Sequence, residues 1–143
     1  MKCCTFFGHR QCPQRIEPML AKTVEELILE QGVTLFYVGG QGEFDSTVQR
    51  VLKKTQEKHP NIEWYEVLAY HPNGSAETKT HETLFPEAAE IGSVRFALSR
   101  RNRWMVLQAD FVVCYVVHEW GGAAQFMEYA MKQKKCVINL AEK

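Results

Sequence analysis

The chain lacks the features that would place it in several large classes of protein. It has no net charge, with 17 Lys and Arg against 17 Asp and Glu, so its bulk charge does not attract nucleic acid or an anionic membrane. No apolar run approaches the length of a membrane span, and the apolar stretch near the start is too short for a signal peptide. We therefore expect a cytoplasmic protein without membrane association, and nucleic acid is not an expected partner.

Motifs for common cofactors are absent too. No GxGxxG precedes an acidic residue at the end of the next strand, and GxxxxGK[ST] does not occur, which argues against NAD and against a P-loop. The five cysteines form no CxxC pair. Cys4, His9 and Cys12 lack the second ligand pair that structural zinc requires, so neither a metal nor a cofactor is expected. Reduced, buried thiols are predicted for Cys3, Cys4, Cys114 and Cys136, which lie in apolar strand-like runs.

What the chain does have is enough apolar sequence for one domain over residues 1–143. Apolar periodicity predicts strands at Lys2–Phe7, Val33–Val38, Ile62–Tyr70, Asp110–Val117 and Cys136–Leu140, and helices at Gln14–Gln31, Phe44–Lys58, Val94–Gln108 and Ala123–Lys134. This alternation predicts an α/β fold, a single Rossmann-like domain with a mainly parallel sheet of about five strands and helices on both faces. Residues 71–92 are predicted to form a long loop, either a lid, a partner-contacting segment or a plain surface excursion.

Two glycine-rich turns follow predicted strands. Gly121, Gly122 and Ala123 come shortly after the strongly apolar run Phe111–Val117, and the turn Gly39-Gly40-Gln41-Gly42 comes directly after Val33–Val38. A strand that leads through glycine into a helix presents unpaired backbone N–H groups to an anion above the strand end. In a parallel sheet, both turns lie at the carboxyl edge, where ligands bind. The sequence therefore predicts a site for a small molecule that carries phosphate.

Arg101 is the second informative feature. It is three residues after Leu98 and four before Met105, so it shares the helix face that is predicted to point inward. An unpaired buried arginine is costly, so a phosphate or carboxylate is expected beside it. The partner is either a ligand or an internal Asp or Glu.

Other candidate residues lie at the same predicted edge. Gly8, His9 and Arg10 follow the first strand, and His9 either contacts the ligand or makes a structural hydrogen bond. Asp45 either accepts hydrogen bonds from ribose hydroxyls or caps the helix that starts near it. Trp120 and Tyr70 either stack on a base or belong to the core.

Several of these segments together resemble a known family. The segments are Thr5-Phe6-Phe7-Gly8-His9-Arg10, Gly39-Gly40-Gln41-Gly42-Glu43-Phe44-Asp45, Arg101-Asn102-Arg103-Trp104-Met105, and Trp120-Gly121-Gly122-Ala123-Ala124 with Tyr129-Ala130. In this order they resemble the YpsA-like branch of the SLOG superfamily, which groups the SMF, DprA and LOG proteins. The resemblance covers nearly the whole chain and implies a Rossmann-like fold that binds nucleotide-derived ligands.

The LOG enzymes, which this chain resembles more distantly, cleave the N-glycosidic bond of modified adenosine monophosphates. In their PGGxGTxxE motif, Gly121 and Gly122 match the glycines and Glu128 matches the glutamate, while Arg101 matches the upstream arginine. Trp120 replaces the proline, Ala124-Gln125 replaces Gly-Thr, and Asn102 replaces a lysine. If the chain is an enzyme, the resemblance makes Glu128 and Arg101 its catalytic residues.

We therefore expect a protein that binds a nucleotide or a nucleotide-derived small molecule, as a sensor or a sequestering protein. The alternative is a phosphoribohydrolase that acts on a nucleoside monophosphate, and a third possibility is a scaffold that acts through protein contacts. The resemblance implies a homodimer or a higher homo-oligomer.

Overall fold

The computed structural model describes residues 1–69, 82–84 and 96–142. Its elements are β1 (Lys2–Gly8), α1 (Ile16–Gln31), β2 (Val33–Val38), α2 (Gly42–Lys58), β3 (Glu63–Val67), β4 (Thr83–Leu84), α3 (Ala97–Gln108), β5 (Phe111–Tyr115), α4 (Gly122–Lys132), β6 (Cys136–Asn139) and the short 3₁₀ helix η3 (Leu140–Glu142). Strands and helices alternate as the sequence predicts, and Gly32 ends α1 in the left-handed conformation, with a φ of 73°.

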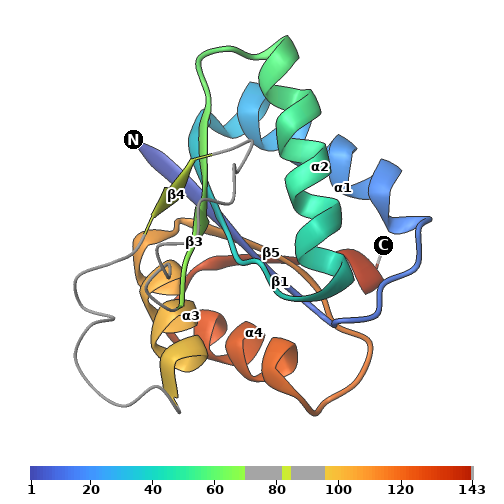
Figure 1. Ribbon diagram of the computed structural model, residues 1–143, viewed down its shortest axis with the longest axis vertical. Coiled ribbons are helices and arrows are strands. Elements are labelled where there is room, and N and C mark those ends of the chain that lie inside the picture. Colours follow the sequence, from blue (N-terminus) through green and yellow to red (C-terminus); the bar gives the residue numbers. More distant parts are fainter. Residues whose placement is uncertain (70–81, 85–95, 143) are drawn as a thin grey trace, which may run out of the picture.

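The strands form one sheet in the order β4-β3-β2-β1-β5-β6, and every neighbouring pair is parallel. Helices α1 and α2 cover one face of this sheet, and α3 and α4 cover the other (Figure 1). The predicted α/β class and the mainly parallel sheet with two covered faces are thus confirmed. The sheet has six strands rather than about five, because Thr83 and Leu84 pair with Glu66 and Val67 inside the segment that was predicted to be a loop. The remainder of 71–92, apart from Glu82, lies outside the described residues.

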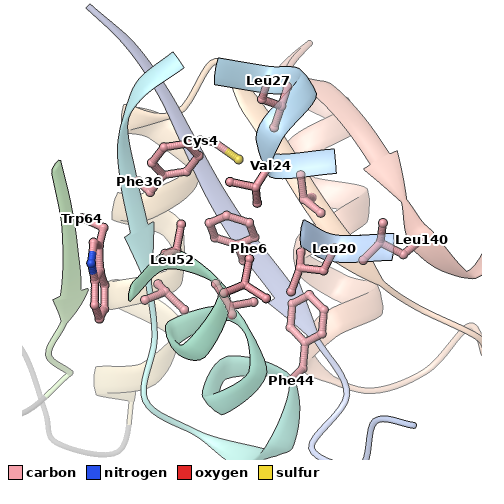
Figure 2. Packing of buried hydrophobic residues seen from close by; sticks show 14 of the residues in the cluster. Cys4, Phe6, Leu20, Val24, Leu27, Phe36, Phe44, Leu52, Trp64 and Leu140 are labelled. Carbon is pink, nitrogen blue, oxygen red and sulfur yellow. The ribbon is translucent and has the colours of Figure 1, made fainter. Parts of the chain in front are cut away.

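Two apolar layers hold the helices to the sheet. On the α1 and α2 face, the Phe6 and Phe36 rings lie 6.1 Å apart, and Leu20, Phe44 and Leu52 close over them (Figure 2). On the opposite face, Phe7 of β1 stacks on Phe126 of α4 at 5.6 Å. Successive residues of a strand point to opposite faces, so adjacent Phe6 and Phe7 anchor the two layers. The central strand β1 is therefore fixed from both sides.

The cysteines are free thiols in the structure. Cys3, Cys4 and Cys114 are buried, as predicted, and burial raises the pKa of both Cys3 and Cys114 to about 12. Cys136 is exposed, contrary to the prediction, because β6 is an edge strand and its first residue faces solvent. Of the helices in the described part of the chain, none combines the length and the apolarity needed to cross a membrane.

Candidate functional site

The candidate site lies where β1 and β5 end side by side. These neighbouring strands are distant in sequence, and Gly8 pairs with Tyr115 at their carboxyl ends. In the sheet, β2 to β4 lie on one side of β1, and β5 and β6 lie on the other side. A switch in strand order leaves a crevice above the strand ends, which is the usual ligand site of such sheets.

A cavity of about 800 Å³ occupies this position. Nine of the predicted site residues line it: Gly8, His9, Arg10, Asp45, Arg101, Trp120, Gly121, Gly122 and Ala123. Residues that were not predicted also line it, among them Gln41, Ser99, Asn102, His118, Gln125 and Phe126. Gly39, Gly40, Gly42 and Glu128 are not among the lining residues, and Tyr70 lies outside the described residues.

The N-terminus of α4 opens into this cavity. Gly121 has a φ of 94°, which strongly favours glycine, and it turns the chain from the β5 end into the helix. No side chain of the described residues caps α4, and a Cβ added to Gly122 would meet nothing within 4 Å. The first backbone N–H groups of α4 therefore face open space with the positive end of the helix dipole behind them. This part of the predicted anion site has the required geometry.

The other glycine turn is used inside the protein. The Gln41 N–H donates to Asp45 Oδ2 at 3.0 Å, and the Glu43 N–H donates to the Arg10 carbonyl at 2.7 Å. Gly42, with a φ of 90°, comes so close that an added Cβ would lie 2.7 Å from Arg10 Cα. These contacts hold the loop after β1 against the start of α2. At the start of α2, the N–H groups of Gln41 and Glu43 thus already have acceptors inside the protein.

Arg101 and Asp45 lie near each other in the wall of the cavity. Arg101 is 4% exposed, its Nη1 donates to the Val67 carbonyl at 3.0 Å, and its Nε donates to Asn102 Oδ1 at 2.7 Å. A Cβ added to Gly39 would lie 2.8 Å from Asp45 Oδ2 and 2.9 Å from Arg101 Nη1, so both side chains pack over this glycine. The inward orientation predicted for Arg101 is confirmed. Its charge faces an internal carboxyl group, which was one of the two predicted partners.

Burial raises the pKa of Asp45 to about 6, while the hydrogen bond from the Gln41 N–H and the charge of Arg101 act in the opposite direction. The pKa of this carboxyl group is higher in the folded state than in the unfolded state. At a pH between these two values, the group therefore takes up a proton when the chain folds. Its contribution to stability therefore decreases as the pH rises from about 4 to about 6 and stays constant above that range.

Replacing Asp45 by Asn is expected to remove this dependence, because the amide keeps the shape and cannot ionise. The free energy of unfolding of Asp45→Asn minus that of the wild type should increase by roughly 1 to 3 kcal/mol between pH 4 and pH 7. Urea denaturation at a series of pH values measures this difference. A difference that does not change with pH would show that Asp45 titrates alike in the folded and unfolded states.

His9 and Trp120 line the cavity through a stack of rings that includes His118. The centroids of His9 and His118 are 3.9 Å apart, and those of His118 and Trp120 are also 3.9 Å apart with an interplanar angle of 10°. The Val117 N–H donates to His9 Nε2 at 3.0 Å. His9 therefore has the structural hydrogen bond that was one of its two predicted roles, and it still faces the cavity.

Glu128 lies away from this cavity. Its exposed carboxylate is 3.4 Å from Lys132 Nζ, and it lines a separate depression on α4 together with Arg103 and Tyr129. Glu128 lies on the exposed side of α4, six residues after Gly122. The structure does not bring together the pair, Glu128 and Arg101, that the distant LOG resemblance made catalytic.

No protein-family model matches the chain, and a search of curated proteins finds no significant match. Among solved structures, the chain is similar to DNA processing protein A (DprA) from Streptococcus pneumoniae, with a TM-score of 0.69 and 15% sequence identity. The similarity covers 96% of this chain and 49% of the DprA chain, so this chain spans about half the length of that protein. At this level of identity the likeness establishes a shared Rossmann-like α/β fold.

Proposed function

We propose that this protein is a member of the SLOG superfamily, of the YpsA-like branch, and that its cavity binds a nucleotide or a nucleotide-derived small molecule. The fold it shares with DprA and the motifs of the sequence both support the superfamily. The observation that carries the binding proposal is the uncapped start of α4, which faces a cavity of about 800 Å³. This volume is typical of small-molecule sites.

The charges around the cavity favour an anion. Arg10 and Arg101 line it, and Asp45 carries the only carboxylate among its described lining residues. The two guanidinium groups therefore outnumber this carboxylate. The guanidinium groups and the helix dipole make the cavity locally positive, although the chain has zero net charge. Local rather than global charge favours a small anionic ligand over nucleic acid.

The geometry favours a binding protein over a glycosidase. Cleavage of a ribosidic bond requires a carboxylate near the positive charge that develops on the sugar. Glu128, which the LOG motif would assign to this role, is exposed and paired with Lys132 outside the cavity. We infer a sensor or sequestering role in which the ligand is bound and released intact.

The proposal is tested by calorimetric titration with AMP, followed by chromatography of the ligand after prolonged incubation. We expect saturable binding and recovery of intact AMP. Release of free adenine by the wild type that disappears in Glu128→Gln would instead establish the glycosidase. The amide of that variant preserves the shape of the side chain while removing its charge, so binding should persist in either case.

A further inference from the structure

Three rings form a continuous stack in the wall of the cavity. His9 follows β1, while His118 and Trp120 belong to the segment between β5 and α4, so the stack joins the two strand ends. The rings of His118 and Trp120 are nearly parallel, at 10°, and those of His9 and His118 are inclined by 23°. All three residues line the cavity.

Hydrogen bonds fix the two histidine rings of this stack. His9 Nε2 accepts from the Val117 N–H at 3.0 Å, so the proton of the neutral ring is on Nδ1. His118 Nδ1 lies 2.8 Å from the Trp120 carbonyl oxygen, which can only accept, so His118 donates from Nδ1. Burial lowers the pKa of His9, and the neighbouring His118 lowers it further, which keeps the ring in the form that accepts this bond. The stack is therefore held in place before any ligand arrives.

Trp120 is the outermost ring, and one of its faces is open. The residue is 70% exposed even though its other face is covered by His118. Among residues 1–69, 82–84 and 96–142, no other ring stacks on it. An aromatic ring that is already stacked on one face loses less conformational entropy when a flat partner binds its other face. In the sequence, Trp120 directly precedes Gly121 and Gly122, where α4 begins.

We propose that the open face of Trp120 seats the heteroaromatic base of the ligand, with His118 and His9 as its backing, and that the seat prefers a purine to a pyrimidine. This inference rests on the proposed function, since it places the base next to the proposed anion site. The preference for purines follows from area, because two fused rings cover more of an indole than one ring does. Stacking of a base on an aromatic side chain does not require hydrogen bonds to the base edge.

The test compares AMP with ribose 5-phosphate, which keeps the phosphate and the sugar and lacks the base. Trp120→Ala is expected to weaken AMP binding between about 5-fold and 150-fold. Its affinity for ribose 5-phosphate should stay within about two-fold of that of the wild type. Trp120→Phe should retain most of the AMP affinity because it restores a flat ring, and UMP should bind the wild type more weakly than AMP does.

Intrinsic fluorescence gives a second measurement on the same samples. The chain has three tryptophans, and Trp120 is far more exposed than the buried Trp64 and the half-buried Trp104. AMP should quench the emission of the wild type, and this quenching should vanish in Trp120→Phe while AMP still binds.

The two proposals fail in different ways. If ribose 5-phosphate and AMP bind the wild type equally well, the base seat is wrong and the anion site stands. If Trp120→Ala lowers the affinity for AMP and for ribose 5-phosphate equally, the base seat is likewise wrong, because the substitution then acts on the anion site. If neither ligand binds the wild type, the proposed function fails and the base seat fails with it.

Discussion

Replacement of Gly122 by valine is expected to weaken AMP binding at least 100-fold and to change the free energy of unfolding by no more than about 1 kcal/mol. A Cβ at this position meets nothing within 4 Å, so the fold can accept the side chain. The branched side chain would, however, stand in the cavity at the start of α4, where it keeps an anion away from the backbone N–H groups. Calorimetry measures the first effect and urea denaturation measures the second.

Gly122→Ala serves as the graded control, since a single methyl group obstructs less of the helix start and should give an intermediate affinity. A folded Gly122→Val variant that binds AMP like the wild type would place the anion site elsewhere. Gly8 is unsuitable for this comparison, because an added Cβ would overlap the Phe44 ring and would disturb the core directly.

Replacement of Arg101 by alanine is expected to lower the free energy of unfolding by about 3 kcal/mol. The guanidinium is buried, donates to the Val67 carbonyl, and lowers the pKa of the buried Asp45 by its charge. Its removal leaves the carbonyl without this donor and Asp45 without the nearby positive charge, and both groups are costly to bury in that state. Urea denaturation at pH 7.5, where Asp45 is mostly ionised, measures the loss.

The double variant Arg101→Ala with Asp45→Asn isolates the charge interaction. Asp45→Asn should stabilise the protein more in the Arg101→Ala background than in the wild type, because without Arg101 the buried carboxylate lacks the nearby positive charge. An equal gain in stability in both backgrounds would show that Arg101 and Asp45 do not interact energetically.

The fold was largely predictable because each strand and helix carries its own pattern. Val33–Val38 was predicted and observed with the same bounds, since Gly32 and Gly39 delimit a short apolar run. Where an apolar run extends beyond the observed strand, a tertiary contact explains why the strand ends earlier. The apolar run at β5 continues to Val117, but the strand ends at Tyr115 because the Asn139 side chain pairs with the backbone of Val116. This contact joins residues 23 apart in sequence and leaves no local signal.

The strand β4 was missed for a similar reason. Two residues, Thr83 and Leu84, are too few to show an alternating pattern, and only their pairing with β3 makes them a strand. Tertiary pairing rather than local propensity determines such a short element.

The candidate site was predictable in place but not in detail. Strand ends and glycines located the carboxyl edge, and helical spacing placed Arg101 inside. The sequence could not distinguish the two glycine turns, because the difference lies in whether the helix donors are already bonded. At the start of α2, the Gln41 N–H is bonded to Asp45 and the Glu43 N–H to the Arg10 carbonyl. The stacking of His118 between His9 and Trp120 was also missed, since it depends on two strand ends meeting.

The central claim is that an anionic ligand binds at the start of α4, and a titration of ¹⁵N-labelled protein with AMP, followed by amide NMR, tests it most directly. We predict that the amide signals of Gly121, Gly122 and Ala123 move downfield with AMP concentration, since their N–H groups face the cavity. The signal of Glu43, which does not line the cavity, should stay in place, because its N–H already donates to the Arg10 carbonyl. Shifts centred on Gln41 and Glu43, or no shift at the start of α4 at saturating AMP, would contradict the account.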